Sequence, residues 1–402
     1  MAMNEDSQPK LDIRQRKPGF SWILALIPLL LLGIVLATVL LTGGGLRELS
    51  GPPVEQLSIQ RVILPQPGQI ELEVINDGPE PVRISQVSVD DAYWNFSMEP
   101  SHAIPRLGRA RITIPYPWVE HEAHQVMLVT EFGATFTREI PVAVETPSPS
   151  SVLFLRFGLV GLYVGIVPVA LGMMWFPLMR RLSREAMNFI LSLTIGLLVF
   201  LAVGTWLDAM EFAADIPVFW QGVPMVVFIA SLALGVLLAM NNRKSGKERS
   251  RLQIARLIAA GIGLHNLGEG LAIGAAFALG QAALGSFLVL GFTLHNITEG
   301  VGIVAPLVDH KPERKQFFTL ALIAGMPAIL GTWIGSFAFN PVLATVFLAI
   351  GVGAILQVVW EVGKLVARGS DQTGMGLVNW SNLAGFSIGL AIMYFTAFLV
   401  KF

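Results

Sequence analysis

A six-residue pattern, His-Asn-x-x-Glu-Gly, occurs twice in this chain, at 265–270 and at 295–300, and both copies lie within apolar sequence. In a helix, residues four apart share a face, so each copy places a histidine nitrogen beside a carboxylate. Such side chains are costly inside a bilayer unless they face a partner, an ion or water, which makes them functional candidates. The copies are separated by about one helical hairpin, so their polar side chains can converge. These side chains are His265, Asn266, Glu269, His295, Asn296 and Glu299.

The residue types suit a divalent transition metal. Histidine nitrogen with carboxylate and amide oxygen is a borderline-to-hard ligand set that fits Zn²⁺, Fe²⁺, Mn²⁺ or Co²⁺ and binds Cu(I) poorly. The sequence contains no cysteine, which excludes disulfides and thiolate metal sites. Two carboxylates would also offset the charge of a dication in a low dielectric. The alternative is that both histidines are buried and satisfied by neighbouring helices, but the repetition of three polar identities in register favours a metal site.

The composition is that of a membrane protein, because 53% of the 402 residues are hydrophobic and only 14% are charged. The net charge of −1 gives no support to a nucleic-acid partner. Residues 20–42 form an apolar run long enough to cross the roughly 30 Å hydrocarbon layer. Basic residues within 1–19 place the N-terminus in the cytoplasm. We interpret 20–42 as an uncleaved transmembrane signal-anchor, with a cleaved leader as the alternative.

Residues 51–147 have a different pattern, in which apolar and polar residues alternate in short runs separated by turn signals. This pattern predicts a small antiparallel β-sandwich of immunoglobulin-like type. Because it follows the anchor, we expect it outside the cytoplasm, and its sequence identifies no partner. His102, His121, Glu122 and His124 are either an external metal-capture site or surface turn residues, since loops between strands carry polar residues in any case. The alternating runs begin at Gln69, Pro81, Ala110, His124 and Thr137.

From residue 152 the sequence is apolar again and predicts eight membrane spans. Lysine and arginine are concentrated in the loops that follow the first, third, fifth and seventh spans, or at the end of the span itself. By the positive-inside rule these loops are cytoplasmic, which places the C-terminus outside. The predicted spans are 152–177, 187–211, 218–240, 253–279, 283–307, 316–338, 341–366 and 379–400.

The fourth and fifth spans carry HNLGEGLAIG and HNITEGVGI. These segments resemble the HNxPEG-like motifs of the ZIP family of divalent-metal transporters, in its bacterial-type branch. The resemblance covers 152–400 and implies an eight-helix ZIP-like bundle with both ends outside the cytoplasm. Weaker similarities follow in order on the sixth, seventh and eighth spans, at 323–335, 353–365 and 382–394.

The resemblance implies secondary transport of a divalent transition metal towards the cytoplasm, with Zn²⁺ as the first expectation. The six motif side chains are then the metal site, the metal is the substrate, no cofactor is expected and the chain is not an enzyme. A homodimer and a bacterial or archaeal cell membrane are also in keeping with the resemblance. The preferred metal, the driving force and the role of 51–147 stay open.

Several positions depart from the family pattern. Gly268 and Thr298 stand where the family usually has proline, which frees a backbone carbonyl, so we expect Gly268 to preserve part of that break and Thr298 none. Met326 stands where bacterial members often have a glutamate of a second metal position, so the choice between one and two metals stays open. The usual second-helix histidine is absent, and Asp208 and Glu211 in that region form either an entrance or exit site or a solvated helix end.

Two other functional classes are compatible with the sequence. A metal sensor or scaffold without transport would use the same site and report to residues 51–147. An intramembrane hydrolase could hold a catalytic zinc on paired His and Glu, but the chain has no HExxH motif. Outside the motifs, Glu361 and Lys364 are three apart near the end of the seventh span and are predicted to form an interfacial ion pair.

Overall fold

The computed structural model describes residues 21–42, 54–214, 216–242, 250–278, 282–338, 340–374 and 376–400. The predicted cytoplasmic segment 1–19 lies outside these residues. Helix α1 (Ser21–Thr42) is present where the anchor was predicted, and Leu26–Val39 is its apolar part. It belongs to a compact unit separate from residues 55–402. The anchoring role of α1 stays a prediction.

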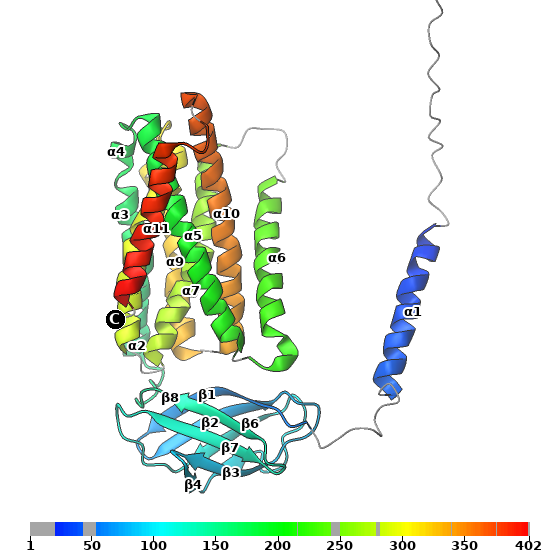
Figure 1. Ribbon diagram of the computed structural model, residues 1–402. Coiled ribbons are helices and arrows are strands. Elements are labelled where there is room, and N and C mark those ends of the chain that lie inside the picture. The colour runs from blue at the N-terminus through cyan, green and yellow to red at the C-terminus, as the bar shows by residue number, and fades with distance from the viewer. Residues whose placement is uncertain are drawn as a thin grey trace, which may run out of the picture. The chain divides into compact units, whose positions relative to one another are not determined.

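The predicted β-sandwich is confirmed, as two four-stranded antiparallel sheets (Figure 1). The strand order is β1-β2-β6-β5 in one sheet and β4-β3-β7-β8 in the other. In sequence letters these orders are A-B-E-D and C′-C-F-G, which is the immunoglobulin-like arrangement. The strands are β1 (Leu57–Gln66), β2 (Gln69–Asn76), β3 (Ile84–Val89), β4 (Ala92–Trp94), β5 (Ser97–Glu99), β6 (Arg109–Ile114), β7 (His124–Thr130) and β8 (Thr135–Ile140).

The core of the sandwich follows from the alternation in its strands. On β2, Ile70 and Leu72 point inward and are fully buried, and their partners across the ladder are Ile114 and Ile112 of β6. Leu128 of β7 packs in the same core from the other sheet. Apolar burial of this kind is the main stabilising term in a sandwich without disulfides.

Eight helices or helix groups are long and apolar enough to cross a membrane, within the residues that the structure describes, as the sequence predicts. The ends agree to within three residues except at α10, which continues to Thr373, beyond the predicted end at 366. The first span is α2 (Ser151–Gly161), π-helix η3 (Leu162–Ile166), α3 (Val167–Met173) and α4 (Phe176–Met179), and the others are α5 (Arg184–Ala214), 3₁₀ turn η4 (Val218–Trp220) with α6 (Gly222–Asn242), α7 (Arg251–Ala278), α8 (Ala282–Val304) with 3₁₀ turn η5 (Ala305–Leu307), α9 (Arg314–Phe337), α10 (Pro341–Thr373) and α11 (Trp380–Val400).

Helix α7 is the most buried of these spans and packs against α8, α9 and α10. Its backbone touches that of α9, because a Cβ on Gly270 would overlap the carbonyl oxygen of Ala328, and one on Gly335 that of Leu271. Small residues permit such close approach between membrane helices. The break expected at Gly268 is wrong, since α7 is an uninterrupted helix. Glycine keeps the N–H that proline lacks, so the hydrogen-bond ladder continues through it.

Candidate metal site

The two motifs meet at the carboxylate of Glu269. Its Oε1 lies 2.9 Å from His265 Nε2 and 2.6 Å from His295 Nε2. Its Oε2 accepts a hydrogen bond of 3.2 Å from the side-chain amide of Asn296. One carboxylate of α7 therefore binds its own helix neighbour and two side chains of α8. The i, i+4 spacing within α7 and the antiparallel approach of α8 together produce this arrangement.

Both asparagines are oriented by backbone carbonyls of other helices. The Nδ2 of Asn266 donates to the carbonyl of Ala324 on α9 at 3.0 Å. The Nδ2 of Asn296 donates to the carbonyl of Val164 in η3, also at 3.0 Å. With the amide nitrogens engaged in this way, each Oδ1 is left as a buried acceptor without a hydrogen-bond partner among the described residues.

The two accepting carbonyls lie near prolines. In an α-helix the N–H of residue 168 would bond the carbonyl of Val164, but residue 168 is Pro and has no N–H. The chain forms the π-helix η3 at this point, a feature that is frequent at functional sites. On α9, Pro327 lies three residues after Ala324. These carbonyls were not predicted; Pro168, which is visible in the sequence, could have indicated that of Val164. Pro327 lacks the N–H that would bond the carbonyl of Ile323, so it gives no such signal for Ala324.

The site has more buried acceptors than donors. Both carboxylate oxygens of Glu299 and the Nδ1 of His265 have no hydrogen-bond partner among the described residues, as is the case for the two asparagine Oδ1 atoms. Ligand atoms of His265, His295 and Glu299 lie within 4.8 Å of one another. All six motif side chains are at most 7% exposed. Unpaired buried acceptors are expensive, and a cation is the partner that satisfies several of them at once.

Other predicted positions lie elsewhere. Asp208 and Glu211 are exposed near the C-terminal end of α5 and do not join the buried group; an entrance or exit role for them stays a prediction. Met326 is 53% exposed, so its side chain does not line the buried site. The hydroxyl of Thr298 donates to the carbonyl of His295 at 2.6 Å. Its backbone N–H, which proline would lack, lets α8 continue as a helix at the position where the family usually has proline.

The histidines of the β-sandwich do not assemble into a site. His102 and His121 are exposed, as expected of turn residues. The turn interpretation is wrong for His124, which is buried on β7 with its Nδ1 2.7 Å from Asp90 Oδ2. Across the described parts of the chain, the group of histidine and acidic residues with metal-ligand spacing is the one on α7 and α8.

The region that contains this site matches a known protein family. The family model described as ZIP Zinc transporter matches residues 239–396, from the end of α6 into α11. This range includes all six motif residues. No curated protein matches the chain.

Proposed function

We propose that this chain, which belongs to the ZIP zinc transporter family over residues 239–396, is a secondary transporter of divalent transition-metal cations and moves them through the site on α7 and α8. The chain is an integral membrane protein with eight candidate spans. Members of the family are transporters rather than enzymes. The observation that carries the proposal is the buried excess of oxygen and nitrogen acceptors between two helices of a membrane bundle.

Each side chain has a part in holding the ion. The imidazoles of His265 and His295 and the carboxylate of Glu299 supply ligands from both helices, and Glu269, which contacts both imidazoles, supplies either a fourth ligand or the acceptor that orients them. Two carboxylates balance the charge of a dication in a low dielectric. Imidazole, carboxylate and amide ligands favour Zn²⁺ and also accept Fe²⁺, Mn²⁺ or Co²⁺.

The asparagines favour passage over permanent retention. Their Oδ1 atoms are neutral ligands, weaker than carboxylates, while their amide groups stay bound to the carbonyls of Ala324 and Val164. An ion can therefore exchange ligands without the loss of these contacts between helices. Secondary transporters commonly place such a site near the bilayer midplane and expose it alternately to each side.

The direction of transport follows from the family resemblance and is towards the cytoplasm. With basic loops inside, residues 51–147 and the C-terminus lie outside, 20–42 is the anchor and 152–400 is the transport domain. The β-sandwich then stands on the side from which the metal enters. A homodimer is compatible with this arrangement.

Uptake into proteoliposomes tests the proposal. Zn²⁺, Fe²⁺ and Mn²⁺ uptake by the unaltered protein is compared with that of the Glu269→Ala/Glu299→Ala double variant. A matched control is Asp309→Asn, which removes an exposed acidic charge outside the site. We expect the double variant to lose uptake and the control to keep it. Equal uptake by all three would exclude this site as the route.

A metal sensor or scaffold is the second candidate, and the attached β-sandwich favours it over an enzyme. It predicts that calorimetry detects metal binding, abolished by the double variant, while the unaltered protein shows no uptake. It also predicts that a change in the sandwich alters metal affinity. Uptake above that of empty liposomes would exclude this candidate.

A further inference from the structure

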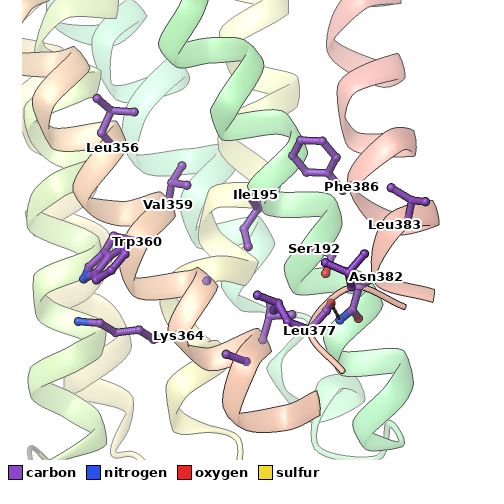
Figure 2. Close-up of a pocket in the computed structure, with 14 residues that line it drawn as sticks. Ser192, Ile195, Leu356, Val359, Trp360, Lys364, Leu377, Asn382, Leu383 and Phe386 are labelled. Atoms are coloured by element: carbon purple, nitrogen blue, oxygen red, sulfur yellow. Dashed lines mark hydrogen bonds between the residues drawn. The ribbon is translucent and has the colours of Figure 1, made fainter. Parts of the chain in front are cut away.

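A groove on the bundle surface is separate from the metal site. It lies between α10 and α11, with α5 contributing to its lining, and has a volume of about 600 Å³. Figure 2 shows Leu356, Val359, Trp360 and Lys364 along α10, and Leu383 and Phe386 on α11. Almost all of the lining is apolar, and Lys364 is its single charged residue.

The length of the groove matches one leaflet of a bilayer. Its lining runs along α10 from Leu356 to Ala367, which at 1.5 Å per residue is about 16 Å. Half of the hydrocarbon layer is about 15 Å thick. Near one end, Trp380 at the start of α11 is 86% exposed, and tryptophan is enriched at the membrane–water interface. The groove therefore extends from the interface into the hydrocarbon by about the depth of one acyl chain.

The shape of this end is fixed by hydrogen bonds between helices. The side-chain amide of Asn382 donates to Ser370 Oγ at 3.0 Å and to the carbonyl of Leu377 at 2.8 Å. Asn188 of α5 donates to the same Ser370 Oγ at 3.2 Å. These bonds connect α5, α10 and α11. A groove that is held open in advance costs less to fill than one that must be ordered on binding.

Lys364 gives the groove a preference for ligands that carry a negative charge. Its Nζ lies 3.2 Å from Glu361 Oε1 and 5.1 Å from the centre of the Trp360 ring. The predicted ion pair is therefore present, although Glu361 is buried rather than interfacial, while Lys364 is 38% exposed. An ammonium group has three donors, so the contact with Glu361 leaves capacity for phosphate oxygens. Arg368, exposed one turn further along α10, adds positive charge at the same end.

We propose that this groove binds an anionic phospholipid, with one acyl chain along α10 and α11 and the phosphate on Lys364. The depth of the groove, its apolar lining and the cation near its interfacial end are complementary to the three parts of such a molecule. Basic pockets between membrane helices on the cytoplasmic side bind anionic head groups, and the positive-inside rule places this end of α10 in the cytoplasmic leaflet.

Two variants separate the head group from the chain. Lys364→Gln removes the charge and leaves the apolar lining. Gly363→Leu fills the groove, because no atom lies within 4 Å of a Cβ at this lining position, and it keeps Lys364. The matched controls are Lys311→Gln, an exposed lysine outside the groove, and Gly235→Leu, an exposed α6 glycine whose Cβ would also meet open space.

The measurement is native mass spectrometry of the full-length protein with phosphatidylglycerol or phosphatidylcholine of identical chains. We expect the unaltered protein and both controls to retain phosphatidylglycerol preferentially. Lys364→Gln should reduce that preference roughly fivefold, the effect of one basic residue on an anionic lipid. Gly363→Leu should reduce retention of both lipids. The control is thermal unfolding in detergent without added lipid. We expect the same unfolding temperature for the variants and the unaltered protein, which would show that the variants remain folded.

Three results would overturn the proposal. The first is equal retention of both lipids by the unaltered protein. The second is displacement of phosphatidylglycerol by glycerol phosphate at matched concentration, which would identify a phosphate site without a chain. The third is a change in oligomeric mass with Gly363→Leu and none in bound lipid, which would make the groove a contact between two copies of the chain.

Discussion

The chain buries a histidine beside a carboxylate in two regions, and the regions differ in whether the neighbouring carboxylate oxygens are paired. In both regions one buried ring nitrogen, Nε2 of His124 and Nδ1 of His265, has no hydrogen-bond partner among the described residues. In the β-sandwich, Asp90 accepts hydrogen bonds from the Tyr116 hydroxyl at 2.7 Å and the backbone N–H of Gln125 at 2.9 Å, and its Oδ2 contacts His124. Both carboxylate oxygens of Asp90 are paired, and the contacts with His124 and Gln125 connect the turn after β3 to β7. In the helical bundle, by contrast, Glu299 has two buried oxygens with no partner among the described residues.

This difference separates a structural histidine from a candidate ligand. The carboxylate of Asp90 is 39% exposed, so its hydrogen bonds stabilise the sandwich at little desolvation cost. A surplus of buried acceptors destabilises the bundle unless a cation is bound, and proteins retain such surpluses where function requires them. The unpaired acceptors beside a buried histidine are therefore more informative than the histidine.

The largest expected effect distinguishes His295 from His124 by their contributions to metal binding. We expect His295→Ala to lower Zn²⁺ affinity by more than roughly 100-fold and to abolish uptake, because loss of a ligand exceeds the 10–100-fold effects of groups that only orient ligands. His124→Ala should leave affinity and uptake per folded molecule unchanged. Calorimetry and proteoliposome uptake on both variants give the result. A loss of affinity with His124→Ala would show that the sandwich takes part in metal binding.

The sequence predicted the architecture and the approach of the two motifs, because each depends on local pattern, while the role of the six motif residues as a metal site stays a prediction. The eight apolar stretches and the alternating runs indicate which residues are buried. The spacing within the repeated motif indicates that its histidine and glutamate lie on one face of a helix. It could not predict the carbonyl of Val164 as the partner of Asn296, since that contact joins residues 132 apart in the chain. The exposure of Met326 and the burial of His124 were missed for a related reason: both depend on which neighbouring element covers a face.

Backbone contact in the bundle gives the next largest effect. Gly270→Leu should lower the stability of the bundle by about 1–3 kcal/mol or more, because its side chain must displace the Ala328 carbonyl of α9. Gly235→Leu, over open space on α6, should be nearly neutral. Thermal unfolding in detergent compares the two. Equal stability would mean that α7 and α9 can separate at no cost, so that the site is not held by their contact.

A smaller effect is expected where the bundle orients Asn296. Pro168→Ala restores the N–H that an α-helix directs to the carbonyl of Val164, in competition with the Asn296 amide. We expect metal affinity to fall by a few fold, since a group that orients a ligand is weakened and none is lost. Its control is Pro341→Ala at the start of α10, a position where proline replaces no helical hydrogen bond. Equal losses in both variants would show that Pro168 has no specific part.

The smallest effect concerns the pH dependence of stability in the β-sandwich, where the oxygens of Asp90 are paired. Burial raises the pKa of Asp90, but hydrogen bonds from Gln125, Tyr116 and His124 outweigh it and hold the pKa below 3.8. Burial and the bond to Asp90 raise the pKa of Tyr116 to about 12. The stabilisation from ionised Asp90 is therefore complete above its unfolded pKa and is lost as pH falls through the folded value. That from neutral Tyr116 is complete below pH 10.0, its ordinary pKa, and is lost as pH rises towards 12.

Tyr116→Phe should thus destabilise the sandwich by about 1 kcal/mol at neutral pH and remove the loss above pH 10. Asp90→Asn should remove the loss of stability at acidic pH, because no carboxylate remains to be protonated. Hydrogen exchange of the β7 amides in the full-length chain, corrected for the intrinsic pH dependence of exchange, measures both. Metal uptake should be unaffected at neutral pH, as the acceptors of Asp90 are all engaged within the sandwich. If either variant changed metal affinity, the two histidine regions would be energetically coupled, and the separation between a structural and a ligand histidine would fail.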